Sequence, residues 1–328
     1  MNRAGHPDGH TGVAQTGKAC GKAILLGEHA VVYGVPALAV GIERGVRAVA
    51  TPCTGESRLA VPSWGVEVTL GARSDLGRAL AALADACGLS TPLAIEASVD
   101  LPHGSGLGCS AALGVAVARA IDPRASAEQI AERVSSWERV FHGNPSGVDA
   151  AVASCGGCVE FTRGDAGGRS RVDPVTIAAP LTVCIGNSGK SSSTAVMVES
   201  VARLRAERPA LVGEAFDAIG SLVAAGRRAI ERGDRASLGR LMDANQTWLG
   251  TLSLSTPAID ELCRIARARG ACGAKLTGAG GGGCVVALVS GAATAQGVLR
   301  SWRAAGFDGF ATRFAPATPE LERIVESA

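Results

Sequence analysis

The chain has 328 residues, of which 47% are hydrophobic, and its 32 basic and 30 acidic side chains leave a formal net charge of +2. This length predicts about two domains, and the apolar content is enough for sizeable cores. The balanced charge excludes an extended basic surface for nucleic acid or an anionic membrane. The longest apolar stretch, residues 30–42, contains Gly34 and Pro36 and is too short to span a bilayer.

The first residues and the cysteines indicate a cytoplasmic protein. No charged-then-apolar signal peptide opens the chain, and residues 1–17 are polar and rich in Gly and His, which predicts a disordered tail. The ten cysteines are scattered. Cys155 and Cys158 form a single C-x-x-C without a second ligand pair, so we expect reduced thiols rather than a zinc or redox centre.

Residues 18–40 contain apolar, strand-like runs on either side of a loop that carries Glu28 and His29. Charged residues beside glycine in a loop held by buried strands suit contact with a ligand, although a surface turn has the same composition. Lys22 is expected just before a strand, either in solvent or pointing into a cleft. The chain has only four lysines, namely Lys18, Lys22, Lys190 and Lys275. Where arginine is the usual cation, each lysine indicates a specific role, with compositional chance as the alternative.

Residues 43–101 read as short strands around one helix. We expect the helix at residues 76–87, ended by Gly88. The expected strands are 47–51, 59–61, 66–70 and 94–99.

A glycine-rich stretch, Pro102–Ala112, follows the last of these strands and leads into an apolar helical pattern at residues 113–121. Alternating glycines permit positive φ and leave backbone N–H groups unhindered, and the helix directs its positive N-terminus into the turn, which makes a site for phosphate. No Gly-Lys-Ser/Thr closes the stretch, so it is not a Walker A loop. Gly106-x-Gly108-x-x-Ala111 fits the dinucleotide fingerprint, a weak match by itself, and a strand-to-helix turn without a ligand is the third alternative.

The next helix is predicted from a capping box at Ser126 and Gln129. Its buried stripe would consist of Ile130, Val134, Trp137 and Phe141. Glu138 lies beside this stripe, and spacing alone favours a carboxylate in solvent.

Residues 142–149 end that helix and begin another. Ser146 and Asp149 have the S-x-x-D spacing of a helix cap, which is a purely structural explanation for Asp149. In either case a carboxylate in the first turn of a helix should stay ionised near neutral pH. An ionised aspartate in a glycine-lined turn could also hold a substrate hydroxyl, as phosphoryl transfer requires.

The second half begins after a polar stretch, residues 162–174, where we expect a domain boundary. A polar turn at residues 187–194 has the composition of a phosphate or carboxylate contact and also of a flexible linker. The glycine run Lys275–Cys284 predicts the close approach of another backbone. The other expected elements are strands at 181–186, 285–289 and 310–314 and helices at 210–232, 237–249 and 257–269.

Taken together, these segments resemble the GHMP small-molecule kinase superfamily and, within it, the mevalonate kinases. The three superfamily motifs occur in order at residues 21–34, 102–112 and 275–283, and residues 142–149 also match. The resemblance covers about residues 18–316, and it displaces the dinucleotide-binding alternative.

The resemblance implies an α+β fold of two domains, where pattern alone gives only mixed α/β in two halves. The N-terminal domain, residues 18–175, would be like domain 2 of ribosomal protein S5, with a left-handed βαβ crossover. The C-terminal domain, residues 176–328, would be ferredoxin-like.

The resemblance also implies ATP and Mg²⁺ as cofactors and a role for each matched residue. Ser110 and Glu138 would hold Mg²⁺. Asp149 would orient or deprotonate the acceptor hydroxyl, and Lys22 would keep Asp149 ionised and neutralise charge on the moving phosphoryl group. Glu28, His29 and Thr194 would face mevalonate. The ATP phosphates would lie on Pro102, Gly104, Ser105, Gly106, Leu107, Gly108, Cys109, Ser110 and Ala111, with Gly280 supporting them from the second domain.

The implied activity is transfer of the γ-phosphoryl group of ATP to the C5 hydroxyl of mevalonate, in isoprenoid precursor and lipid metabolism. The alternatives are another GHMP kinase, for phosphomevalonate or a sugar, and a non-catalytic relative. Two positions depart from the family pattern: Cys109 stands where a serine is usual, and no arginine lies near Thr194 to bind a carboxylate. The expected partner is a small molecule, not nucleic acid or a membrane, and the sequence leaves monomer or homodimer open.

Overall fold

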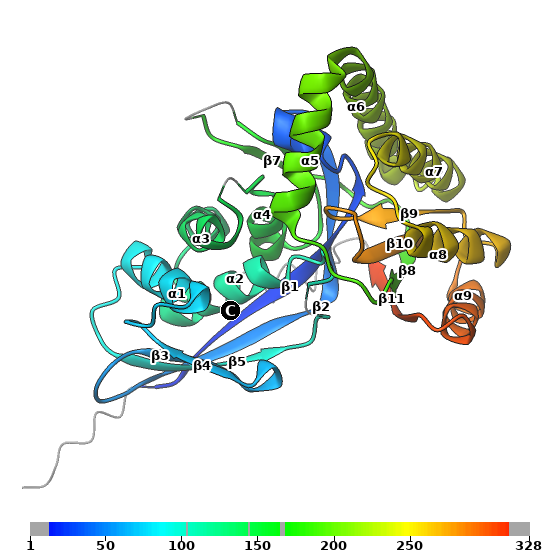
Figure 1. The fold of residues 1–328 in the computed structure, drawn as a ribbon. Coiled ribbons are helices and arrows are strands. Elements are labelled where there is room, and N and C mark those ends of the chain that lie inside the picture. The colour runs from blue at the N-terminus through cyan, green and yellow to red at the C-terminus, as the bar shows by residue number, and fades with distance from the viewer. Residues whose placement is uncertain (1–12, 103, 144, 165–167, 315–328) are drawn as a thin grey trace, which may run out of the picture.

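The computed structural model describes residues 13–102, 104–143, 145–164 and 168–314. These residues form a seven-stranded sheet and a four-stranded sheet, each packed against its own helices (Figure 1). The chain passes from the first sheet to the second between β7 (Arg171–Pro174) and β8 (Leu181–Asn187). The α+β fold expected from the resemblance is confirmed.

The first sheet is built on a long antiparallel hairpin of β1 (Gln15–Leu26) and β2 (Ala37–Pro52). The start of β2 pairs with β6 (Cys158–Thr162), and its end pairs with β5 (Leu93–Val99). The sheet has the order β4-β3-β5-β2-β6-β7, with β3 at Arg58–Val61 and β4 at Val66–Thr69. The turns hold two short 3-10 helices, η1 (Ala30–Tyr33) and η2 (Pro62–Trp64).

The central helix of this half is α2 (Cys109–Ile121), which is almost entirely buried against the β1–β2 hairpin. β1 approaches it so closely that a Cβ at Gly17 would lie 2.0 Å from the carbonyl oxygen of Ala116, so only glycine fits there. Around α2 lie α1 (Asp75–Ala86), α3 (Ala127–His142) and α4 (Val148–Cys155). The predicted capping box at Ser126 is present at the start of α3.

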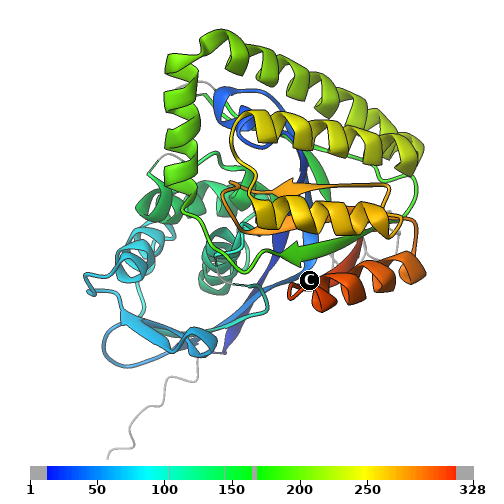
Figure 2. The ribbon, with the colours of Figure 1, turned by 45° about the vertical axis from the view of Figure 1, so that its right-hand side comes forward.

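The second sheet is antiparallel throughout, in the order β11-β8-β10-β9. Its other strands are β9 (Gly273–Thr277), β10 (Cys284–Val289) and β11 (Asp308–Phe314). Figure 2 shows α7 (Arg235–Thr251), α8 (Pro257–Ala268) and α9 (Ala292–Ala304) on one side of this sheet. Two further helices, α5 (Thr194–Glu207) and α6 (Pro209–Arg232), connect β8 to α7.

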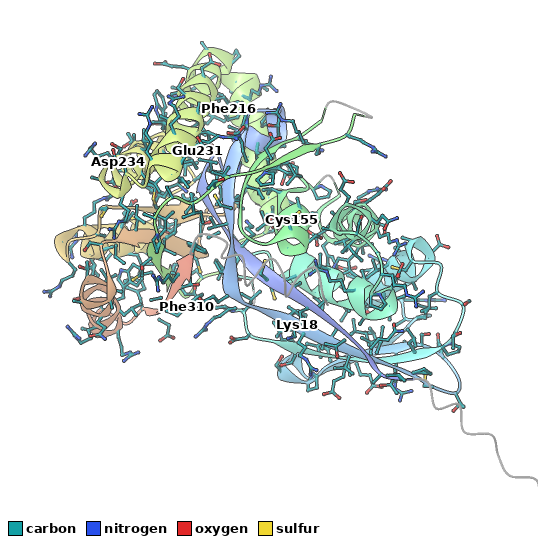
Figure 3. The ribbon with its side chains drawn as sticks, turned by 180° about the vertical axis from the view of Figure 1, so that it is seen from behind. Lys18, Cys155, Phe216, Glu231, Asp234 and Phe310 are labelled. Carbon is teal, nitrogen blue, oxygen red and sulfur yellow. The ribbon has the colours of Figure 1, made fainter. Side chains whose placement is uncertain are left out.

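One described helix, α6, passes a test of length and composition for crossing a membrane, a test that buried helices of other proteins also pass. Its apolar side packs on the end of the β1–β2 hairpin: the rings of Tyr33 and Phe216 lie 5.0 Å apart, and a Cβ at Gly226 would lie 2.3 Å from Leu26 Cδ1. Figure 3 shows Phe216 at one end of the hairpin and Lys18 toward the other. The hairpin therefore joins the two halves of the molecule.

The structure differs from the sequence expectations at several element boundaries. The tail expected over residues 1–17 lies outside the described residues up to residue 12, and Gln15–Gly17 already belong to β1. Lys22 lies inside β1 rather than before a strand. The polar stretch 162–174 contains β7, which pairs with β6. Neither α5 nor α9 was expected, and α5 has a weak pattern because Val201 is its one buried residue.

Candidate active site

The stretch from Pro102 to Ser110 forms a glycine turn that opens directly into α2. Gly104, Gly106 and Gly108 adopt φ values of 64°, 77° and 71°, which side-chain-bearing residues rarely adopt. Gly108 is the N-cap of α2 and supplies no side chain to cap it. The first N–H groups of the helix are therefore available to an anion, and the helix dipole favours one there. The backbone N–H of Lys22 donates to the Leu107 carbonyl (2.9 Å), which ties the turn to β1.

The second glycine run lies directly against this turn. A Cβ at Gly278 would lie 2.9 Å from the carbonyl oxygen of Gly106, and one at Gly283 would lie 3.0 Å from that of Ser105. Gly280 is equally restricted, since a Cβ there would meet the Leu254 carbonyl oxygen at 2.5 Å. The close backbone approach predicted from the glycine run is confirmed. The backbone that approaches it is that of the glycine turn in the first half.

Lys22 and Asp149 form an ion pair beside the turn, with 3.0 Å between Nζ and Oδ1. β1 places Lys22, whose side chain is 4% exposed, and the first turn of α4 places Asp149, whose side chain is 32% exposed. A Cβ at Gly108 would lie 2.9 Å from Lys22 Cγ and 3.7 Å from Asp149 Oδ2. Glycine at the start of α2 therefore brings the helix N-terminus close to both charged groups.

Asp149 does not cap its helix. The N-cap of α4 is Gly147, at φ 89°, and no side chain makes a capping hydrogen bond. Ser146 Oγ accepts a long hydrogen bond from the N–H of Val148 (3.4 Å). The capping alternative for Asp149 is therefore wrong, and its carboxylate is directed to Lys22.

Ser110 and Glu138 form a second polar pair at the mouth of the turn. Ser110 Oγ donates to Glu138 Oε1 at 2.7 Å, and His142 Nε2 lies 3.8 Å from Glu138 Oε2. Glu138 is 3% exposed, so the expectation of a carboxylate in solvent is wrong. Burial and the nearby charge of Asp149 raise the pKa of Glu138 to about 7, against the hydrogen bond from Ser110 and the charge of Lys22.

A bound cation would suit this pair, because a buried carboxylate beside a hydroxyl is relieved by positive charge. Magnesium often takes one or two protein oxygens and completes its shell with water and substrate phosphates. The described residues contain no group of three or more His, Cys, Asp or Glu side chains able to hold a metal by themselves. Ser110 and Glu138 therefore fit a magnesium ion that arrives with a nucleotide.

Glu28 and His29 lie in the loop after β1, and both are tied to the second half of the molecule. Glu28 is ion-paired with Lys275, and His29 Nε2 lies 2.8 Å from the Ala279 carbonyl oxygen, to which it donates. Burial lowers the pKa of His29, which favours the neutral imidazole. His29 adopts φ 61°, an unusual value for a residue with a side chain, which is consistent with a loop held from both sides.

Three hollows meet at Asp149 and Thr194, both of which line all three. A hollow of about 530 Å³ extends along the glycine turn to apolar side chains that include Trp64, Leu76 and Trp137. A small cavity of about 80 Å³ is lined by Lys22, Glu28, His29, Asp149 and Thr194, among others. A wider cleft of about 910 Å³ opens beside them, lined by Glu138, His142, Arg163 and Glu199, among others. The 530 Å³ hollow along the glycine turn offers room for a nucleotide, and the small cavity offers room for its acceptor.

The structure thus brings together the residues selected from the sequence, with some differences in their surroundings. Thr194 is the first residue of α5 and is exposed at the shared edge of the hollows. Cys109 lines the 530 Å³ hollow, and burial raises the pKa of its thiol to about 12, so it is not an activated nucleophile. Ala111 is fully buried in the first turn of α2.

Sequence reasoning missed Arg163. It follows β6 in the stretch where a domain boundary was expected, yet its guanidinium donates to the Val32 carbonyl (3.3 Å) and its side chain lines the wide cleft. A lone arginine in a polar segment carries no sequence signal, because only the pairing of β6 with β2 brings it to the cleft.

Comparison with known proteins identifies the class to which this fold and site belong. The family model for the GHMP kinase N-terminal domain matches residues 75–157, and the model for the C-terminal domain matches residues 227–308. The chain belongs to the GHMP kinase family. It is an ATP-dependent small-molecule kinase by that membership.

Three similar proteins are mevalonate kinases. Mevalonate kinase from Methanothermobacter thermautotrophicus is 33% identical over 294 residues, which cover 86% of this chain and 93% of that protein. Mevalonate kinase from Pyrococcus abyssi is 32% identical and covers 93% of this chain and 97% of its own. The crystal structure of L. major mevalonate kinase in complex with R-mevalonate superposes with a TM-score of 0.81, at 26% identity over 94% of this chain and 97% of that one.

Proposed function

We propose that this chain is a mevalonate kinase, which transfers the γ-phosphoryl group of ATP to the C5 hydroxyl of mevalonate and releases 5-phosphomevalonate for isoprenoid precursor synthesis. The observation that carries the proposal is the Lys22–Asp149 pair, which lies where the 530 Å³ hollow meets the small cavity. An acceptor hydroxyl in the cavity can then face both Asp149 and a phosphoryl group held over the glycine turn. In-line transfer depends on this kind of placement.

Asp149 is the group that orients the C5 hydroxyl and accepts its proton as the new O–P bond forms. Lys22 forms an ion pair with Asp149 at 3.0 Å and from there would stabilise negative charge on the phosphoryl oxygens. The N-terminus of α2 adds a positive dipole on the same side. Phosphoryl transfer depends on positioning and charge more than on covalent chemistry, and these groups contribute both.

The nucleotide would place its phosphates on Gly104–Ser110, with Ala111 in the helix behind them and Gly280 in the opposite loop. Pro102 begins the turn and accepts a hydrogen bond from Ser105 Oγ (2.7 Å). Ser110 and Glu138 would hold Mg²⁺, which would supply positive charge against the negative charge that develops on the phosphates.

For the acceptor, Glu28, His29 and Thr194 would contact mevalonate in the small cavity, whose lining includes all three. Arg163 supplies the arginine that the turn 187–194 lacks. It lines the wide cleft together with Thr194 and Val32, and a guanidinium pairs well with a carboxylate. We therefore assign the acceptor carboxylate to Arg163.

The second candidate is a GHMP kinase for phosphomevalonate or a sugar, because the acceptor contacts are few. A non-catalytic relative is disfavoured, since Lys22, Ser110, Glu138 and Asp149 are all present and lie around one turn. Such a kinase needs neither nucleic acid nor a membrane to act, and we place it in the cytoplasm.

The test is a coupled assay of ADP release with ATP and Mg²⁺ against mevalonate, phosphomevalonate, galactose and homoserine. Mevalonate should give the highest kcat/KM by a wide margin, with 5-phosphomevalonate identified by mass spectrometry. A far higher kcat/KM for another acceptor would refute the substrate assignment while leaving the family unchanged.

A further inference from the structure

The most deeply buried ion pair among the described residues joins the two halves of the molecule. Lys275 in β9 and Glu28 in the loop after β1 are each 0% exposed in their side chains and are 247 positions apart in sequence. Lys275 Nζ donates to Glu28 Oε1 and to the Leu276 carbonyl oxygen (2.5 Å). Two of its three N–H groups are therefore directed to protein acceptors.

The carboxylate of Glu28 is only half satisfied. Oε1 accepts from Lys275, whereas Oε2 is buried and has no hydrogen-bond partner among the described residues. A buried polar oxygen without a donor is costly, which makes a donor from a ligand favourable. Glu28 lines the 80 Å³ cavity beside Asp149, so a ligand in that cavity is the available source of a donor.

Lys275 itself touches none of the space that substrates would occupy. It lines neither the small cavity, nor the 530 Å³ hollow, nor the wide cleft. Of its two hydrogen-bond partners only Glu28 lines one of these spaces, so the Lys275 side chain can act on the acceptor through Glu28.

We propose that Lys275 is a positioning residue for the acceptor: it fixes Glu28 so that Oε2 accepts a hydrogen bond from an acceptor hydroxyl other than the one phosphorylated. The identity of that hydroxyl, the tertiary C3 hydroxyl of mevalonate, rests on the proposed function. Burial raises the pKa of Glu28, and the charge of Lys275 opposes that rise. Lys275 therefore favours the charged form of Glu28, in which both oxygens are hydrogen-bond acceptors.

The position of Lys275 in β9 also explains how a lysine of the second half can influence the acceptor site in the first half. β9 continues into the loop whose Ala279 carbonyl holds His29 and whose Gly278 backs Gly106. The loop after β9 therefore contacts both the loop that carries Glu28 and His29 and the glycine turn at Gly106, and it fixes the position of one relative to the other. Asn245 adds a nearby uncharged contact, since its Oδ1 accepts from the N–H of Gly27 (3.3 Å).

A purely structural role is the competing explanation, and the chain offers a matched control for it. Arg227 in α6 forms an ion pair with Glu160 in β6 (3.3 Å), which also joins the two halves but lines none of the three hollows. Arg227→Met removes such a contact without touching Glu28. It should change the melting temperature only, with acceptor KM within two-fold of wild type.

The experiment uses the full chain and the acceptor that the wild-type enzyme phosphorylates best. Lys275→Met and Glu28→Gln should each raise the acceptor KM by at least ten-fold while the KM for ATP stays within two-fold. The double variant should be no worse than the poorer single variant, because the two residues act through one hydrogen bond. Lys275→Gln, which keeps a donor without the charge, provides a second variant if Lys275→Met fails to fold.

A substrate analogue completes the test. Removing the non-reacting hydroxyl from the acceptor (3-deoxymevalonate for mevalonate) should weaken binding to wild type by a similar factor and should cost the Lys275 variants nothing further. Equal binding of acceptor and analogue by wild type would overturn the proposal, as would a folded Lys275 variant with unchanged acceptor KM. Inactivity of wild type toward mevalonate would refute the proposed function instead, because the Lys275 effect is a ratio measured on the best acceptor.

Discussion

The molecule contains two lysine–carboxylate pairs near one site, and they differ in burial. Lys22–Asp149 lies at the junction of three hollows, and the Asp149 side chain is 32% exposed. Lys275–Glu28 lies between the halves with both side chains 0% exposed. Asp149 of the first pair lines all three hollows, whereas Glu28 is the one member of the second pair that lines any of them, the small cavity. The same pair of residue types therefore serves chemistry in one place and positioning in the other.

Removal of metal should have the largest effect on turnover and should leave both ion pairs intact. Turnover by the wild-type enzyme should be abolished by EDTA, because the charge developing on the phosphoryl group needs a cation as well as Lys22. The melting temperature of the nucleotide-free protein should not change, since neither ion pair contains a metal. Excess Mg²⁺ should restore the rate. Full activity in chelator would exclude the metal roles of Ser110 and Glu138.

Neutralising Asp149 tests the chemical role of the exposed pair. Asp149→Asn should lower kcat by about 10²–10⁴-fold while ATP still binds, because a group acting on the hydroxyl proton is lost. Lys22→Met should have a similar effect, and the double variant should be far from additive. Steady-state kinetics and a nucleotide titration measure both. Near-normal kcat in a folded Asp149→Asn enzyme would refute the assignment.

The buried pair should have the larger effect on stability. Lys275→Met leaves an unpaired carboxyl in the interior and should lower the free energy of unfolding by about 3–5 kcal/mol. The double variant Lys275→Met/Glu28→Gln should recover part of that loss, since no buried charge remains. Denaturant unfolding of the two variants and of Lys22→Met gives the comparison. A smaller loss for Lys275→Met than for Lys22→Met would contradict the contrast in burial.

The raised pKa of Glu138 predicts a pH-dependent stability, to which burial contributes most and the charge of Asp149 contributes as well. Its pKa of about 7 in the folded protein lies above its ordinary value of 4.5. Protonated Glu138 therefore stabilises the folded state below about pH 4.5, and this stabilisation is lost as pH rises through 7. At about 1.4 kcal/mol per pKa unit, the loss in the free energy of unfolding is on the order of 3 kcal/mol.

Thermal unfolding of the nucleotide-free and metal-free protein measures this effect. Glu138→Gln should flatten the pH dependence, and Asp149→Asn should move the loss to lower pH because one cause of the raised pKa is removed. A wild-type profile identical to that of Glu138→Gln between pH 4.5 and 7 would be inconsistent with the buried carboxyl.

The smallest effect is expected at Cys109, which lines the nucleotide hollow without belonging to either pair. Cys109→Ser should keep kcat within a few-fold, because the thiol stays protonated and packs against its neighbours. The assay is the same steady-state measurement. Complete loss of activity in the folded variant would show that the thiol has a chemical role.

The sequence by itself determined the features that depend on local backbone chemistry. Gly104, Gly106 and Gly108 predicted a turn at positive φ that opens into a helix, because residues with a Cβ disfavour those angles. Ser126 and Gln129 predicted the start of α3, because a capping box is completed within four residues. The resemblance carried by three motifs then supplied the fold and the family.

Only the tertiary structure decided how the charged residues are used, because their surroundings come from distant segments. Spacing placed Glu138 beside an apolar stripe, and the packing of α3 on α2 buried it against Ser110. Ser146 and Asp149 have the spacing of a helix cap, but the structure shows no capping hydrogen bond there. Asp149 is instead paired with Lys22 in β1. Lys275 and Glu28 are 247 residues apart, so no local pattern could pair them, and the docking of the two halves made that contact.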